Sequence, residues 1–257
     1  MGKTRKNNNH RDATTVARAF AIAALLTCSS AYAGDPADHV YLPSVVQGEV
    51  ELELNGGFQQ WPNNSGNDEW QLIYEAGYGV TSWWKSELGI GSTRLPGEST
   101  HLDELEWENI FALTEPGEYW VDLGLFAELE HDYGAHGNVL TIGPMFQNET
   151  GAVQTNVNLL FSRGLGELGS QGTELDYDWQ VKWRGNPLFE PGMQGFGTLG
   201  STGEAGHPTT HKLGPALFSQ QRVGGRNKLK FDTALLFGLN ANSPHTTLRF
   251  TLEYEMY

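Results

Sequence analysis

The sequence has almost no cysteine and no long hydrophobic run. Cys28 is the only thiol in 257 residues, which excludes an intrachain disulfide. No stretch of about 18 or more apolar residues occurs, so no helix is expected to span a bilayer. The mean hydropathy of −0.42 is that of a water-soluble chain. A transmembrane β-barrel still fits these values, because only alternate residues of its strands face lipid.

Basic residues are also scarce: 16 Lys and Arg stand against 31 Asp and Glu, for a formal net charge of −15. Five of the basic residues fall within the first 18 positions, so the rest of the chain is more acidic still. Such a polyanion cannot neutralise phosphates, and nucleic acid is therefore excluded as a partner.

Residues 1–33 have the pattern of a cleavable signal peptide. A basic leader precedes the apolar run at 19–28, and Ala31 and Ala33 form the small-x-small site before Gly34. Two alternatives are a buried core helix and a lipid attached to Cys28, for which the preceding Thr27 is a poor neighbour. Cleavage after Ala33 predicts an exported protein without a thiol.

From Gly48 onward, apolar and polar residues alternate with a period of two. Val50, Leu52 and Leu54, for example, alternate with glutamates, and the same pattern runs from Leu248 to Met256. This alternation indicates strands with one apolar and one wet face. About twelve strands are expected, near 48–58, 69–78, 82–92, 103–113, 119–130, 138–147, 152–162, 174–184, 190–199, 211–222, 228–238 and 246–256.

Each expected strand is roughly ten residues long, the length that a tilted strand needs to cross a bilayer. The connections alternate between short turns and longer polar loops, as in bacterial barrels. We therefore predict an all-β fold: a closed antiparallel transmembrane β-barrel over 48–257. Residues 34–47 would form a short periplasmic segment ahead of it, and both chain ends would lie in the periplasm.

Aromatic residues gather at the expected strand ends. Trp83, Trp84, Trp120 and Trp183 stand beside turns, where barrels place amphipathic rings at the membrane interfaces. The alternative is a soluble β-sandwich with ordinary core aromatics.

Three segments resemble those of proteobacterial outer-membrane barrels: 75–84 (EAGYGVTSWW), 143–146 (GPMF) and the C-terminal 247–257. The similarity is to the group of porins and transporters associated with aromatic-degradation pathways, and it covers most of 48–257. It implies location in the outer membrane, with membrane lipid and the barrel assembly machinery as partners. One departure is Tyr257, which falls out of phase with the lipid-facing series that ends at Met256.

If the apolar face meets lipid, the charged face lines the lumen. The expected lumen-lining residues are Glu49, Glu51, Glu53, Glu104, Glu106, Glu108, Asp122, Glu128, Asp176 and Asp178, with Lys182, Lys228, Lys230 and Arg249 as counter-charges from later strands. Carboxylates in a channel concentrate cations. The pattern predicts a passive pore or transporter for small solutes with a cation-preferring lumen. Charges that merely pair across a filled interior are the alternative.

No catalytic signature is present: G-x-S-x-G does not occur, and no Ser, His and Asp are singled out by spacing. We expect no enzyme, no cofactor and no metal site. An outer-membrane lipid-modifying enzyme and a secreted soluble β-sandwich binding protein remain as alternatives. His131 with His136, and His207 with His211, could hold a divalent ion beside Glu130 or Glu204, but solvated loop histidines explain them as well. The sequence does not predict the oligomeric state.

Overall fold

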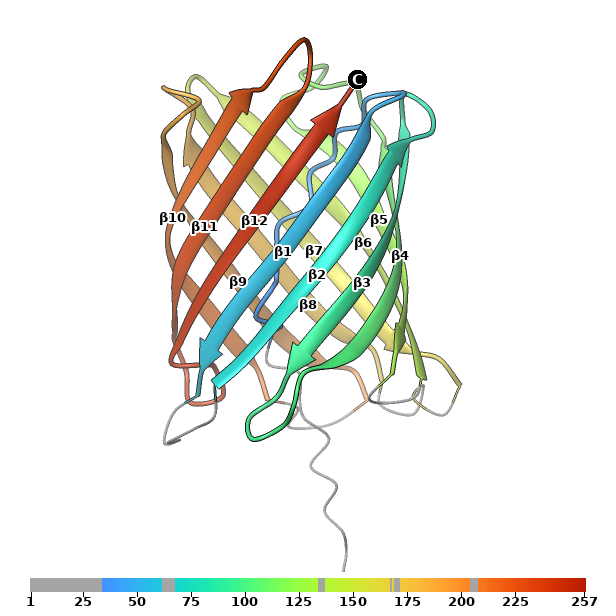
Figure 1. Cartoon of the computed structure of the whole chain (residues 1–257), viewed down its shortest axis with the longest axis vertical. Coiled ribbons are helices and arrows are strands. Elements are labelled where there is room, and N and C mark those ends of the chain that lie inside the picture. The colour runs from blue at the N-terminus through green and yellow to red at the C-terminus, as the bar shows by residue number, and fades with distance from the viewer. Residues whose placement is uncertain (1–33, 62–67, 134–136, 167, 169–171, 204–207) are drawn as a thin grey trace, which may run out of the picture. The chain divides into compact units, whose positions relative to one another are not determined.

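The computed structural model describes residues 34–257 except 62–67, 134–136, 167, 169–171 and 204–207. The described residues form twelve antiparallel strands that close into a barrel (Figure 1). The strands are β1 (Val50–Gln60), β2 (Asp68–Gly79), β3 (Trp84–Arg94), β4 (His101–Ala112), β5 (Asp122–Asp132), β6 (Gly137–Thr150), β7 (Val153–Gly164), β8 (Glu174–Trp183), β9 (Glu190–Ser201), β10 (Thr210–Arg222), β11 (Lys228–Gly238) and β12 (Thr246–Met256). The described residues contain no helix long and apolar enough to cross a membrane.

The predicted number of strands and the closed antiparallel barrel are confirmed, and the soluble β-sandwich is wrong. Each strand pairs with its neighbour in the chain, and β1 pairs with β12 from Val50↔Met256 to Gln60↔Thr246. This last pairing leaves no open sheet edge. We call the end of the barrel with the β2–β3 connection the turn end, and the end with the β1–β2 connection the loop end.

The largest difference between a predicted and an observed strand start is at β5. The expected strand 119–130 is β5, which begins at Asp122. Side chains bind backbone donors around its start: Gly117 N–H donates to Asp122 Oδ1 at 2.7 Å, and Leu123 N–H donates to Thr114 Oγ1 at 2.9 Å. Asx- and ST-type bonds of this kind compete with strand pairing, so the turn extends to residue 121.

Because apolar and polar residues alternate along each strand, the barrel has distinct outer and inner faces. On β4, Leu105 and Trp107 are 46% and 48% exposed, whereas Glu104 and Glu106, which alternate with them, are 6% and 7% exposed. Leu248 and Leu252 on β12 are likewise exposed, and Arg249 between them is buried. The outer face is thus apolar and the inner face polar, the reverse of a soluble barrel.

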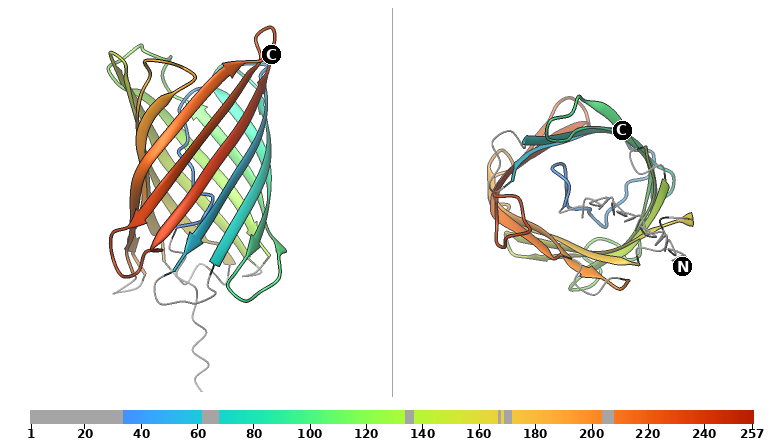
Figure 2. Two further views of the ribbon diagram at one scale, coloured as in Figure 1. Left: turned by 60° about the vertical axis from the view of Figure 1, so that its left-hand side comes forward. Right: turned by 90° about the horizontal axis from the view of Figure 1, so that it is seen from below.

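The segment that precedes β1 runs through the barrel interior. Figure 2 shows this segment, drawn in blue, enclosed by the ring of strands. It begins at the loop end, where Gly34 O accepts a bond from Gln59 Nε2, and reaches the turn end, where Gly48 N–H donates to Gly79 O. The sequence indicated only a short segment here, ahead of the barrel.

Two small apolar clusters lie inside the barrel around this segment. Val40 packs in one cluster with Phe196, Ala216, Phe218, Ala234 and Leu236. Tyr41 and Val45 pack against the other, which comprises Ile110, Phe126, Met145 and Leu160. The expectation that apolar side chains face outward is therefore wrong at these positions. They point inward because the segment shields them from water.

Candidate functional site

The candidate site is the inner wall of the barrel. The residues expected to line a lumen have inward positions, and most of them are buried. The buried ones are Glu49, Glu51, Glu104, Glu106, Glu108, Asp122, Glu128, Asp178 and Arg249, while Glu53, Asp176 and Lys182 are partly buried.

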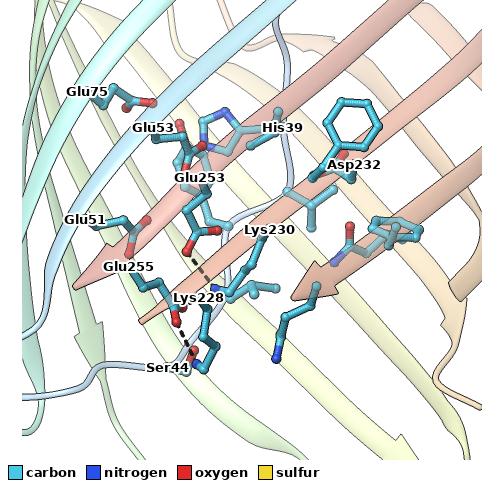
Figure 3. A pocket seen from close by; sticks show the side chains of 18 of the residues that line it. His39, Ser44, Glu51, Glu53, Glu75, Lys228, Lys230, Asp232, Glu253 and Glu255 are labelled. Atoms are coloured by element: carbon cyan, nitrogen blue, oxygen red, sulfur yellow. Dashed lines mark hydrogen bonds and ion pairs between the residues drawn. The ribbon is translucent and has the colours of Figure 1, made fainter. Parts of the chain in front are cut away.

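A cavity of about 270 Å³ opens inside the barrel toward the turn end (Figure 3). Its walls carry nine carboxylates and four lysines. The carboxylates are Glu49, Glu51, Glu53, Glu75, Glu87, Glu190, Asp232, Glu253 and Glu255, and the lysines are Lys85, Lys182, Lys228 and Lys230. Segment residues His39–Leu42, Ser44 and Val46 also contribute to the walls.

Each lysine in the cavity wall is held by glutamate. Lys85 Nζ lies 3.2 Å from Glu51 and 2.8 Å from Glu87, and Lys182 Nζ lies 3.4 Å from Glu190. Lys228 and Lys230 pair with Glu255 and Glu253, each at 2.6 Å. The carboxylates outnumber the lysines, and one oxygen, Glu49 Oε2, is buried without a hydrogen-bond partner among the described residues. The cavity wall therefore carries more acidic than basic side chains.

His39 faces this cavity but adds no positive charge to it. Burial, together with the charges of Arg249 and Lys85, lowers its pKa from the usual 6.5 to about 3. Its imidazole is neutral at physiological pH, and the excess of carboxylates is not offset.

A continuous belt of hydrogen-bonded polar side chains, mostly amides and including Arg249, runs around the wall deeper in the barrel. Gln147 on β6 is linked through Asn156 and Gln180 to Gln194 on β9, by bonds of 2.8, 3.2 and 3.2 Å. Arg249 on β12 then donates to Gln194 at 3.0 Å and also to Thr251. Thr251 donates to Asn55 on β1 at 2.6 Å, which completes what we call the amide belt.

Tyr41 ties the interior segment to the wall. Its N–H donates to Asn158 Oδ1 at 2.9 Å, its carbonyl accepts from Asn158 Nδ2 at 3.0 Å, and its hydroxyl donates to Glu108 at 2.9 Å. The ring stacks on Phe126, with centroids 3.9 Å apart.

Charged and glycine contacts hold the remainder of the segment. Lys212 Nζ lies 2.9 Å from Asp38 and donates to Asp35 O at 2.8 Å. Gly57 on β1 allows close approach, because a Cβ atom there would overlap the carbonyl group of Pro36. The segment is therefore fitted to this wall along its length.

The predicted interface aromatics lie at the turn end. Trp120 is 83% exposed, and Trp83 and Trp183 are about half exposed. Trp84 is partly buried and donates from Nε1 to Asn109 Oδ1 at 3.0 Å. Their contact with a membrane interface stays a prediction.

The remaining candidates give no combined site. His131 Nδ1 bonds Asn138 Oδ1 and His211 Nδ1 bonds Tyr177 OH, and no histidine belongs to a ligand group among the described residues. His136, His207 and Glu204 lie outside the described residues, as do the cleavage positions Ala31 and Ala33. Tyr257, expected out of phase, turns its hydroxyl inward to Glu255 at 2.8 Å.

A closed antiparallel barrel with twelve strands, an apolar outer face and a charged inner face has the fold of outer-membrane β-barrels. No protein-family model matches the chain, and no curated protein is similar to it in sequence.

Solved structures share this fold at low sequence identity. An outer-membrane channel from Pseudomonas putida F1 matches with 12% identity and a TM-score of 0.58, over 86% of this chain and 98% of that chain. The NanC porin matches with 12% identity and a TM-score of 0.53, over 80% and 99%. The translocator domain of the autotransporter NalP from Neisseria meningitidis matches with 11% identity and a TM-score of 0.50, over 86% and 90%. The likeness is one of fold.

Proposed function

We propose that this chain is a passive outer-membrane pore for small solutes, with an interior that prefers cations. The observation that carries the proposal is the turn-end cavity, in which nine carboxylates face four lysines inside a closed barrel. Side chains of one sign in a low-dielectric passage concentrate ions of the opposite sign.

The membrane location rests on the outer face. Apolar side chains cover it, and bilayer lipid is the partner that such a face requires. Export by a signal peptide cleaved after Ala33, insertion by the barrel assembly machinery and an interface belt of Trp83, Trp84, Trp120 and Trp183 complete this part of the proposal. On the sequence resemblance, the solutes would be those of aromatic-degradation pathways.

The interior favours a pore over an enzyme. The buried carboxylates of Glu51, Glu75 and Glu108 are held by a lysine, an amide and Tyr41. Among the described residues no nucleophile is paired with a histidine and a carboxylate. The carboxylates therefore suit electrostatic selection of solutes better than chemistry on a substrate.

The test is conductance in a planar bilayer under a KCl gradient. The intact chain should give small channels whose reversal potential shows K⁺ preferred over Cl⁻, because the cavity carboxylates repel anions. The double variant Glu49→Gln/Glu53→Gln should lose much of this preference. The control Glu118→Gln, an exposed residue in a turn, should keep it. Anion preference, or no conductance from either the intact chain or one lacking the interior segment, would contradict the proposal.

A further inference from the structure

Three glutamates meet on the inner wall beside the interior segment. Glu75 on β2 and Glu106 and Glu108 on β4 each present a carboxylate oxygen, and these oxygens lie within 4.8 Å of one another. All three side chains are buried, with 7%, 7% and 3% exposure. We call this group the glutamate triad.

Two members of the triad are partnered and the third is not. Asn55 Nδ2 donates to Glu75 Oε2 at 2.6 Å, and Tyr41 OH donates to Glu108 Oε1 at 2.9 Å. Glu106 receives no hydrogen bond and no ion pair from any residue that the structure describes. Its Oε2 lies over the backbone of Gly89, where a Cβ atom would come within 2.6 Å. The Glu106 side chain is thus more than nine-tenths buried and offers the triad a carboxylate that no described residue occupies, which leaves an open acceptor for a ligand.

The neighbouring strand adds further negative charge. In the β4–β5 register, Glu106 lies opposite Glu130, and Glu108 lies opposite Glu128. Like charges directly opposite on neighbouring strands destabilise a sheet. The other group of three glutamates in the barrel, Glu51 with Glu53 and Glu253, is balanced by Lys85 and Lys230. Among the described residues no lysine or arginine forms an ion pair with the triad.

We infer that the glutamate triad binds a hard divalent cation, with Ca²⁺ the best match. The ligand set is all oxygen and anionic, which suits Ca²⁺ and Mg²⁺ and disfavours softer metals. Oxygens within 4.8 Å of one another can share one cation, and Ca²⁺ accepts irregular sets of carboxylates and waters, whereas Mg²⁺ demands near-ideal octahedral geometry. Three carboxylates and water complete such a site without any movement of the backbone.

The site lies next to the interior segment, because Glu108 is the residue that Tyr41 holds. A cation bound there reduces the repulsion between the facing glutamates of β4 and β5. It also holds in place the Glu108 carboxylate, which accepts a hydrogen bond from Tyr41. This inference does not depend on solute passage, and binding can be measured on protein that conducts nothing.

The test is calorimetric titration of Ca²⁺ into folded, EDTA-washed protein in a neutral detergent, with Mg²⁺ as the comparison. The intact chain should bind one Ca²⁺ more tightly than Mg²⁺, and binding should raise the temperature at which the barrel unfolds. Glu106→Gln keeps the size of the side chain and removes its charge, so Ca²⁺ affinity should fall about tenfold or more. Without Ca²⁺ this variant should be at least as stable as the intact chain, because it removes like-charge repulsion.

The matched control is Glu69→Gln, which neutralises a partly buried glutamate on β2, the strand of Glu75, that lies outside both the triad and the turn-end cavity. Its affinity for Ca²⁺ should stay that of the intact chain. Equal affinity in Glu106→Gln and the intact chain would overturn the site, as would the absence of saturable binding. Equal loss in both variants would show non-specific attraction by an acidic interior and would overturn it as well.

Discussion

A chain that lacks residues 35–46 should conduct ions several-fold better than the intact protein, in single channels recorded under the same salt. The interior segment occupies the space between the walls and packs against two apolar clusters, so its removal widens any path through the barrel. Single-channel conductance measures the change directly. Heat-modifiable migration on a gel would show that the shortened chain still closes into a barrel.

A point variant tests the same idea without deletion. Gly57→Ala places a Cβ atom where the Pro36 carbonyl group lies, so the start of the segment must move away from β1 and conductance should rise. Gly56→Ala is the matched control, because its Cβ atom meets only the side chains of Phe250 and Leu72. If both the deletion and Gly57→Ala conduct like the intact chain, the segment does not restrict passage.

Arg249→Ala should lower the free energy of unfolding by about 3 kcal/mol, the cost of breaking a buried ion pair. Arg249 is 1% exposed, pairs with Asp232 at 2.7 Å and joins Gln194 to Thr251 in the amide belt. Its loss leaves Asp232 without its cation and opens the belt between β9 and β12. Urea unfolding in lipid vesicles, followed by tryptophan fluorescence, gives the free energy.

The control for this variant is Arg184→Ala. Arg184 pairs with Glu149, but the two side chains are 42% and 46% exposed. An exposed pair contributes about 1 kcal/mol or less. Equal losses in the two variants would show that burial of Arg249 in the belt has no special effect on stability. The double variant Arg249→Met/Asp232→Leu should recover part of the loss, since no unpaired charge is then left.

The strands could be predicted because one physical rule produces them. A strand between lipid and a polar interior must alternate apolar and polar residues, as Leu105, Glu106 and Trp107 do. The number of strands and their approximate bounds follow from the same pattern. The predicted strand bounds are inaccurate where side chains accept hydrogen bonds from backbone donors, as Asp122 and Thr114 do at the start of β5.

The interior segment could not be predicted by the same rule. Nothing in the alternation says what fills the space between the inner faces, and the contacts of Tyr41 with Asn158 join residues 117 positions apart. One signal was present. Phe126 falls on the wet side of its strand, in phase with Asp122 and Glu128, and so do Phe196 and Leu236 on theirs. Large apolar residues at inward-facing positions indicate that another part of the protein shields them from water.

The pairing of β1 with β12 has a consequence for how the molecule is made. The seam joins the barrel strand that comes first in the chain to the one that comes last, so the ring can close only after all twelve strands have been made. Until then β1 presents unpaired backbone donors and acceptors, which recruit other strands. A catalyst of insertion that shields β1 while β12 arrives would prevent such encounters, and the time spent unclosed sets the window in which nascent copies can aggregate.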